Sequence, residues 1–433
     1  MAENEISHER TAGSEPIALV ISVFILGALA GLGAAALMLI LEGIGDGAQW
    51  LSNLAVENGF GTVSLWRLVF VVAAALIAGC VWWKLRTRTK RVPSVAQAVQ
   101  GAIMPVWQSI THVLLQILIV GTGSSIGREV APRELGALLA QRYCALLKLD
   151  AATTKMLVAV TAAAGLAGVY DAPLAGTMFA VEILLADIRI RTVGVALGAS
   201  ATAAFVADSI TGRHAYYDVA AWQNALGGQF PVPANVTAFA VICGIVCGFL
   251  GAWFRILSSW AGKHKPQGVG IVWAMPLAAL CTGLVAIWMP QVMGNGQKVA
   301  QSIFDTSLLP QLGGISVPFV VLILMLAKAV LTIATIRSGA SGGVLQPGIA
   351  VGACAGALLG LVWMLVFPGT SLSIFVFIGA AALLSASQQA PLMALFLVME
   401  LTESPIALAV PAGVAVMMSV MVSGLVLKTY SRS

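Results

Sequence analysis

Long runs of apolar residues limit how this chain can fold more than any other feature. Residues 16–44 and 67–83 contain one charged residue each, and a helix needs roughly 20 apolar residues to cross a bilayer. Only 9% of all residues are charged, whereas soluble domains carry about 25%. The alternation typical of membrane-spanning strands does not occur, which argues against a β-barrel. The sequence therefore predicts an all-α polytopic membrane protein.

The basic residues indicate membrane topology. The net charge is +5, and the basic residues gather beside apolar runs, in residues 84–91, 187–191 and 263–265. Such clusters usually lie in the cytoplasm, so we expect no nucleic-acid partner; a lipid-binding or regulatory role for the clusters is the alternative. Residues 1–15 are polar and acidic, unlike the start of a signal peptide, and are predicted to form a cytoplasmic tail.

Cysteine and histidine give no sign of a metal or disulfide site. The six cysteines form no CxxC pair and lie mostly in apolar runs, and the four histidines are scattered. Small buried cysteines usually serve as packing residues. We therefore expect no metal and no cofactor.

Three short motifs recur in the same order, at offsets of 217, 216 and 218 residues. Each match is weak alone, because glycine and alanine are abundant, but three matches at nearly one offset indicate an internal repeat. The paired motifs are GALAG (27–31) with GIVCG (244–248), GSSIG (123–127) with GASGG (339–343), and APLAGTMFAVE (172–182) with APLMALFLVME (390–400).

The repeat predicts a division of the chain into two membrane units. The first covers residues 16–210 and the second residues 235–430, with a polar connector at 211–234 and a short end at 431–433. Repeats of this kind in transporters are often inverted, with a binding site where the halves meet. Many apolar segments are only 10–16 residues long, so we also expect broken and re-entrant helices that do not cross the membrane.

Both glycine-rich motifs, GSSIG and GASGG, read as breaks between helices at membrane depth. Non-helical backbone there must be buried in protein or line a wet cavity. Each break precedes a helical pattern with proline in its first turn, at Pro132 and Pro347. Free amides and the helix dipole favour an anion at such a start. Two of these starts, one from each repeat, predict a shared central anion site.

Glu129 is an acidic residue at one of these predicted helix starts. A tethered carboxylate there can occupy the site of a free anion and leave it when protonated. Ionisable residues within membranes are usually functional, so we interpret Glu129 as a proton-sensitive gate. The alternative is a capping glutamate in a buried pair with Arg128.

A GxSxG spacing also matches the nucleophile elbow of serine hydrolases, with Ser125 as the nucleophile. The elbow needs a preceding strand, and the preceding THVLLQILIV is typical of a membrane helix. No histidine has an obvious place in a triad. An intramembrane hydrolase therefore remains a minor alternative, as does a transporter of an unrelated solute.

Together the motifs resemble those of the CLC family of chloride channels and chloride/proton exchangers. GSSIGREVAP (123–132) is similar to the GREGP-type motif, SGGVLQP (341–347) to the GxFxP motif and YDAPLAGTMFAVE (170–182) to the APLAG helix of that family. The order is the same, and the resemblance runs from about residue 16 to 430. It implies an all-helical homodimer in the cell's inner membrane, with one ion pathway per subunit and no enzymatic activity.

The resemblance also implies site residues. Glu129 matches the external gating glutamate, and Tyr430 is the best match to a tyrosine whose hydroxyl closes the inner side of the site. The residues whose backbone amides are expected near the anion are Gly127, Val130, Val344 and Leu345.

Several positions depart from the family pattern. The best match to its serine-bearing GSGIP motif is GAIMP (101–105), which places Ala102 at the serine and Met104 nearby as possible inner-pore residues. Fluoride-selective members also lack that serine, so fluoride export is the alternative to chloride transport. Exchangers commonly carry two adjacent glutamates where this chain has Glu182 and Ile183. Glu182 and its repeat mate Glu400 are expected to form helix-packing hydrogen bonds, with a proton role for Glu182 as the alternative.

The sequence thus predicts transport of chloride or a similar small anion through a site gated by Glu129. Passive conduction and proton-coupled antiport both stay open at this point. No cytoplasmic regulatory domain is expected after Tyr430, in contrast to longer members of the family.

Overall fold

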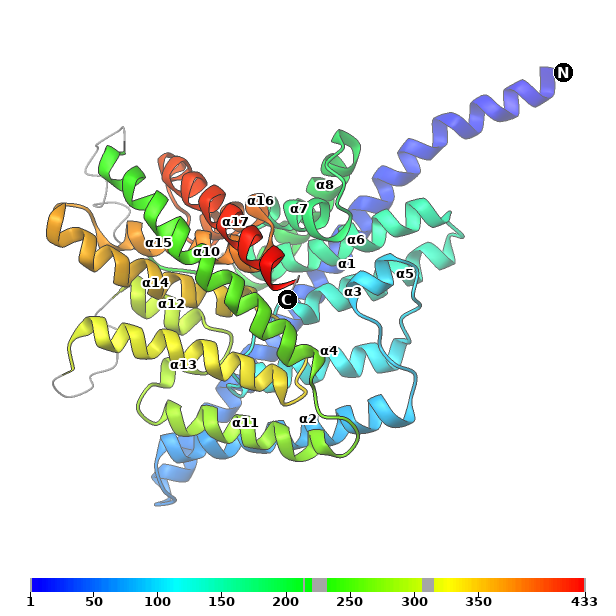
Figure 1. The fold of residues 1–433 in the computed structure, drawn as a ribbon. Helices are drawn as coiled ribbons and strands as arrows, with labels where there is room; N and C mark the ends of the chain where they lie inside the picture. The colour runs from blue at the N-terminus through cyan, green and yellow to red at the C-terminus, as the bar shows by residue number, and fades with distance from the viewer. Residues whose placement is uncertain (1, 213–214, 220–231, 306–314, 432–433) are drawn as a thin grey trace.

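The protein is a bundle of helices, seen here in a computed structural model that describes residues 2–212, 215–219, 232–305 and 315–431, with side chains from residue 17 onward. No named strand occurs within these residues, which confirms the all-α prediction (Figure 1). The helices are α1 (Ala2–Glu57), α2 (Val63–Arg88), α3 (Val95–Val99), α4 (Val106–Gly121), α5 (Val130–Leu146), α6 (Ala151–Tyr170), α7 (Pro173–Met178), the π-helix η1 (Phe179–Leu184), α8 (Ile190–Thr211), α10 (Ala234–Lys263), α11 (Gly270–Ala286), η2 (Pro290–Val292), α12 (Gln297–Phe304), α13 (Val317–Arg337), α14 (Leu345–Val366), α15 (Leu372–Gln388), α16 (Pro391–Leu401), η4 (Ile406–Leu408) and α17 (Ala409–Tyr430).

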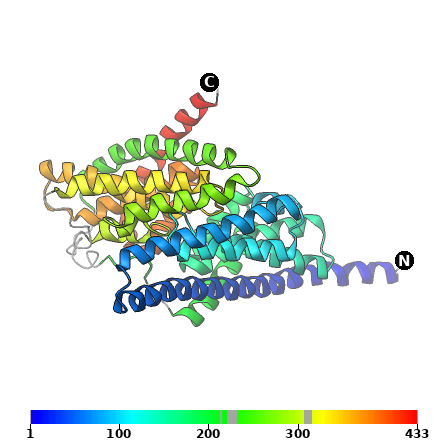
Figure 2. The same ribbon diagram turned by 90° about the horizontal axis from the view of Figure 1, so that it is seen from below.

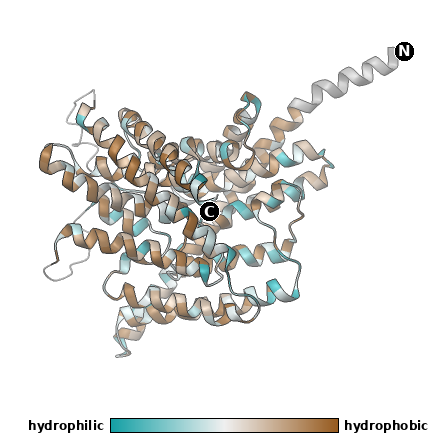
Figure 3. Cartoon of the chain, in the orientation of Figure 1, coloured by the Kyte–Doolittle hydropathy of each residue, from teal (hydrophilic) through white to brown (hydrophobic). Residues whose placement is uncertain are grey.

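Within the described residues, eight helical segments are long and apolar enough to cross a membrane. Others are shorter: α4 has 16 residues and α16 has 11, which correspond to about 24 and 17 Å of helix against a hydrocarbon core of about 30 Å. Hydrophobic residues dominate the helices, and hydrophilic ones gather toward loops and helix ends (Figure 3). The expected mixture of spanning and shorter helices is therefore present.

In each half, two helices pack closely against each other at a glycine. In the first, Gly27 on α1 lies so close to α8 that a Cβ would be 2.8 Å from the carbonyl oxygen of Ala199. In the second, Gly248 on α10 lies equally close to α17, where a Cβ would be 2.9 Å from the carbonyl oxygen of Ser419. Both glycines belong to the repeated GxxxG motifs, so the sequence repeat is a repeat of helix contacts.

A second pair of contacts joins the halves to each other. The carboxylate of Glu182 in η1 accepts hydrogen bonds from the amides of Leu392 and Met393 in the first turn of α16, at 3.1 and 2.7 Å. Glu400 on α16 accepts in the same way from two first-turn amides of α7, both at 2.8 Å. Each half therefore caps a helix of the other, as expected of inverted repeats, and the predicted packing hydrogen bonds are confirmed.

The helix bounds can be compared with the predicted segments. Helix α8 ends at Thr211 and α10 begins at Ala234, on either side of the predicted connector. Residues 213–214 and 220–231 of that connector lie outside the described part of the chain. Helix α1 begins at Ala2, so the stretch predicted as a tail forms its first turns, and this end extends away from the other helices (Figures 1 and 2).

Candidate anion site

The two glycine-rich breaks, one from each half, meet face to face. Helix α4 ends before the first break and α13 before the second. In each break the backbone turns at a glycine with φ +112°, which is Gly123 in the first break and Gly339 in the second. The amide of Gly127 donates to the carbonyl of Gly343 at 2.8 Å, and the amide of Gly343 donates back at 2.9 Å. This two-way bridge brings the starts of α5 and α14 together, as predicted.

Glu129 lies directly at this junction. Its side chain is completely buried, and Oε1 accepts a hydrogen bond of 2.6 Å from the amide of Leu345, the first residue of α14. Its other oxygen, Oε2, is buried without a hydrogen-bond partner among the described residues. The carboxylate of the first half is thus hydrogen-bonded to the first amide of a helix in the second half. An anion is electrostatically favoured at this position.

Two arginines flank Glu129 without forming a salt bridge to its carboxylate. The guanidinium of Arg128 lies over the rings of Tyr170 and Tyr216, at 5.6 and 5.4 Å from their centroids. The Nε of Arg133 donates to the backbone carbonyl of Glu129 at 2.6 Å. The alternative interpretation is a capping glutamate paired with Arg128. Glu129 does bond to the first amide of α14, but no ion pair between Arg128 and Glu129 occurs among the described residues.

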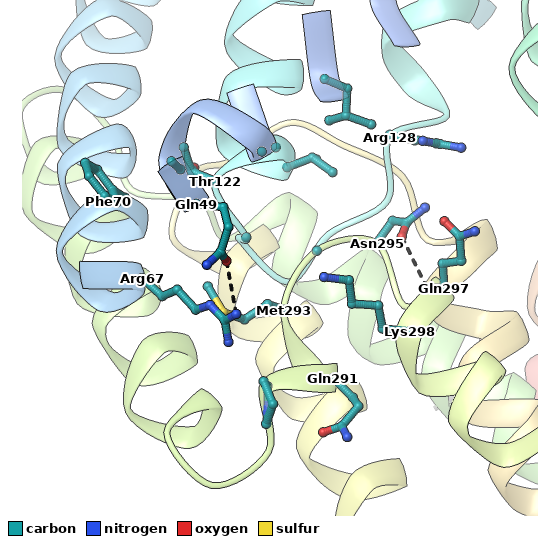
Figure 4. A pocket seen from close by; sticks show the side chains of 18 of the residues that line it. Gln49, Arg67, Phe70, Thr122, Arg128, Gln291, Met293, Asn295, Gln297 and Lys298 are labelled. Atoms are coloured by element: carbon teal, nitrogen blue, oxygen red, sulfur yellow. Dashed lines mark hydrogen bonds between the residues drawn. The ribbon is translucent and has the colours of Figure 1, made fainter. Parts of the chain in front are cut away.

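A cavity of about 870 Å³ adjoins the junction (Figure 4). Arg67, Arg128 and Lys298 line it together with one carboxylate, that of Asp46. Arg67 is near the start of α2, whereas the basic segment 84–91 is at the other end of this helix of 26 residues. Such basic segments usually lie in the cytoplasm, so we expect the cavity to open on the outer side. Its lining carries a net positive charge.

Sequence reasoning missed Lys328, a fully buried cation beside the first break. Its Nζ donates to Ser125 Oγ at 2.9 Å and to the carbonyls of Val292 and Gly294 at 3.2 and 2.6 Å. A lysine at membrane depth is costly, and its amine favours anions nearby when it is protonated. The sequence signal for this site was a lysine inside the apolar run of α13.

Sequence reasoning also missed a buried aromatic cluster behind the site. Tyr170, Tyr216 and Tyr217 pack edge to face, with neighbouring centroids 5.1 and 5.0 Å apart. The side chain of Gln346, the residue after Leu345, donates to the hydroxyl of Tyr217 at 2.8 Å. Two of these tyrosines come from the predicted connector, so the connector supports the start of α14.

Comparison with known proteins agrees with this architecture. Residues 73–424 match the family described as voltage gated chloride channel. The chain belongs to the voltage-gated chloride channel family. It is therefore an anion channel or a chloride/proton antiporter, and an integral multi-pass membrane protein whose bacterial relatives place it in the inner membrane.

Members of this CLC family cover nearly the whole chain. The voltage-gated ClC-type chloride channel ClcB of Salmonella typhimurium is 29% identical over 393 residues, which are 87% of this chain and 89% of ClcB. A putative ClcB-like chloride channel protein of Ralstonia nicotianae is 29% identical over 352 residues, 78% of each chain.

Solved CLC structures share the fold. A slow cyanobacterial Cl⁻/H⁺ antiporter superposes with a TM-score of 0.78 at 19% identity and covers 94% of both chains. A CLC-type fluoride/proton antiporter gives a TM-score of 0.73 at 21% identity, over 94% of this chain and 96% of its own.

The structure also shows where the amides expected from the CLC resemblance lie. Those of Val130 and Leu345 are in the first turns of α5 and α14, where amides have no partner within the helix, and Val344 caps α14. Gly127 is different, because its N–H already donates to Gly343. The prediction that this amide binds the anion is corrected on that ground.

The GAIMP loop lies elsewhere than expected. The amide of Met104 donates to the side chain of Gln141 at 3.0 Å, and Gln141 donates to the carbonyl of Ala102 at 2.8 Å. Gln141 is twelve residues after Glu129, or about 18 Å along α5. This placement does not support Ala102 and Met104 as residues of the inner pore.

Tyr430 is the last residue of α17 and is 53% exposed. The helix continues unbroken to this residue, and the C-terminal end of the chain projects from the other helices (Figure 2). The role of its hydroxyl at the inner side of the site stays a prediction from the CLC resemblance.

Replacement of Tyr430 by Ala is expected to leave anion selectivity unchanged, because the exposed ring lies outside the site. Reversal potentials measured with chloride and nitrate would check this. A shift as large as that produced by a change at Glu129 would mean that Tyr430 reaches the pathway after all.

Proposed function

We propose that the protein moves chloride or a similar small anion through a central site between the starts of α5 and α14, and that Glu129 gates this site. The observation that supports the proposal most strongly is the 2.6 Å hydrogen bond from the amide of Leu345 to Glu129 Oε1. In this state the tethered carboxylate takes the place of the transported anion.

The gate works by competition between two anions. An ionised Glu129 is stabilised at a helix N-terminus, as any anion would be. Protonation removes the charge and with it most of the advantage over free chloride. Because Oε2 has no hydrogen-bond partner among the described residues, the carboxylate is bound more weakly still, since a buried carboxylate normally needs several hydrogen bonds. Acidic conditions should therefore open the site.

Chloride is proposed ahead of fluoride. The GAIMP loop, whose missing serine pointed to fluoride, is held against the far part of α5. Its composition therefore does not favour fluoride at the site.

Flux from liposomes tests the proposal. Purified protein in chloride-loaded liposomes should release chloride faster at acidic than at alkaline pH, with fluoride a poorer substitute. Release no faster than from protein-free liposomes would contradict anion transport, and faster release of fluoride than of chloride would favour a fluoride exporter.

Ser125 is proposed to have a structural role. It is completely buried, follows a helix and accepts a hydrogen bond from Lys328. A serine beside a lysine also occurs in hydrolases, but a nucleophile must reach a substrate. Ser125→Ala removes one of the three acceptors of Lys328 and should cost about 1 kcal/mol of stability with chloride flux largely retained. Abolished flux in a protein with a wild-type melting profile would argue against this role.

The further partners are lipid and a second copy of the chain. Large apolar side chains are exposed along α8 and α17, among them Phe205 at 72% and Leu425 at 68%. Within a bilayer such surfaces face lipid or another subunit. We infer a homodimer from the family, and cross-linking in native membranes would check it.

A further inference from the structure

His112 and Glu134 form a buried hydrogen-bonded pair on the inner side of the site. His112 on α4 lies with Nδ1 2.7 Å from Glu134 Oε2 on α5, and their side chains are 13% and 6% exposed. The side chain of Gln116 donates to the same oxygen at 2.7 Å. Buried pairs are costly to form, and ionisable groups at membrane depth are usually functional.

The pair touches the second glycine-rich break. His112 Nε2 lies 3.2 Å from Ser341 Oγ, and Ser341 precedes Leu345 by four residues. The imidazole therefore contacts, through the hydroxyl of Ser341, the same glycine-rich segment that leads to the amide of Leu345 bonded to Glu129. Among the described residues, Arg86 is the other titratable side chain at this hydroxyl, and its Nη2 donates to it at 3.1 Å.

The surrounding charges place the pair on the cytoplasmic side. Arg86 belongs to the basic segment at the end of α2 and also donates to the carbonyl of Gly339 at 2.8 Å. Lys265, just after α10, donates to the carbonyl of Ala340 at 2.9 Å. Burial, and then the nearby charge of Arg86, lower the pKa of Lys265 to about 8. Both groups are therefore predominantly cationic at neutral pH, and Glu134 is the one acid among them.

The acid suggested by sequence is poorly suited to exchange protons. Both oxygens of Glu182 are engaged by amides in the first turn of α16, so its carboxylate already serves as a cap of that helix. The next residue, Ile183, cannot carry a proton. Histidine, in contrast, is the side chain that ordinarily exchanges protons between pH 5 and 8.

We propose that His112 and Glu134 form the inner proton-exchange site of this transporter. Nε2 takes a proton from a cytoplasmic hydronium ion, which leaves as water, while the carboxylate of Glu134 balances the charge of the imidazolium. The Nε2–H bond then breaks toward water beside Ser341, and this water passes the proton to the carboxylate of Glu129. The resulting neutral acid releases the amide of Leu345. The inference rests on the proposed function, since Glu129 is the final acceptor.

Parallel recording of chloride and proton movement in liposomes tests the inference. His112→Gln and Glu134→Gln are compared with His264→Gln, which alters an exposed histidine bonded only to the carbonyl of Trp260. We expect His264→Gln to match wild type. We expect the two site variants to keep chloride flux but to lower the protons moved per chloride by at least about tenfold, as befits the loss of a proton-transfer group.

Three results would overturn the inference: an unchanged proton-to-chloride ratio in His112→Gln, an unchanged ratio in Glu134→Gln, or wild-type chloride flux without any protons. The first two leave the proposed function intact if Glu129→Gln still abolishes proton movement. Retained proton movement in Glu129→Gln would instead contradict the gate itself. If the two site variants do not fold, Ser341→Ala keeps the hydrogen-bonded pair and should still lower the ratio, and an unchanged ratio there counts equally against the relay.

Discussion

Replacing Glu129 with Gln will make chloride flux independent of pH and will stop the movement of protons with chloride. Glutamine keeps the size of the side chain but carries no charge and cannot exchange a proton. The hydrogen bond from the amide of Leu345 to a carboxylate is charge-assisted and is worth roughly 1.5–3 kcal/mol. Its loss removes the competitor of the anion, so the site stays open at every pH.

The measurement is chloride and proton flux from liposomes over a range of pH. Glu403→Gln is the matched control, because it neutralises an exposed carboxylate outside the site and should behave like wild type. A pH response of wild-type size in both Glu129→Gln and Glu129→Ala would show that another group gates the pathway.

Replacing Gly343 with Ala will reproduce much of the Glu129→Gln behaviour without touching the glutamate. A Cβ at Gly343 would overlap the carboxyl carbon and Oε1 of Glu129. The carboxyl group lies at the far end of a flexible side chain and can rotate away, whereas the bridged backbone of Gly127 and Gly343 cannot. We expect chloride flux that responds at least about tenfold less to pH, consistent with the loss of one charge-assisted hydrogen bond.

Gly348→Ala is the control for this substitution. Gly348 is five residues further along, in α14, where a Cβ would meet its nearest neighbour, Ser387 Oγ, at an ordinary 3.5 Å. It should retain the pH response of wild type. A Gly343→Ala protein that folds and keeps the full pH response would mean that the carboxylate does not rest where the structure places it.

The meeting of the two halves could be predicted because its signals are rare in such a chain. Charge beside glycine inside an apolar run singled out Glu129, and the repeated GxSxG spacing paired the two breaks. These features are local in sequence. They indicate an anion site because the free amides and the dipole at a helix start favour negative charge. The resemblance to the CLC family added the position of Leu345, whose amide indeed holds the carboxylate.

The details that could not be predicted depend on contacts between distant segments. Gly127 donates to Gly343 because the two breaks pair in one particular register, which no single break specifies. His112 and Glu134 lie on different helices, and only the crossing of α4 and α5 brings them together. A scattered histidine therefore gave no indication of a partner.

Local sequence features bear on two further expectations. The inner loop was assigned to GAIMP, although Pro93 and the capping box of Ser94 with Gln97 mark the start of α3 before it. The CLC resemblance matches Tyr430 to a tyrosine whose hydroxyl closes the inner side of the site. However, no glycine or proline interrupts the last six residues of α17, so the helix continues to its end.

Chloride binding to the purified protein tests the central claim most directly, because the account requires one site for two anions. Calorimetric titrations of wild type and Glu129→Gln should be run at acidic and at alkaline pH. Wild type is predicted to bind chloride more tightly at acidic pH and to take up a proton as it does so, while Glu129→Gln binds tightly at both. Equal affinity of wild type and Glu129→Gln at alkaline pH would contradict the claim that the carboxylate and chloride compete.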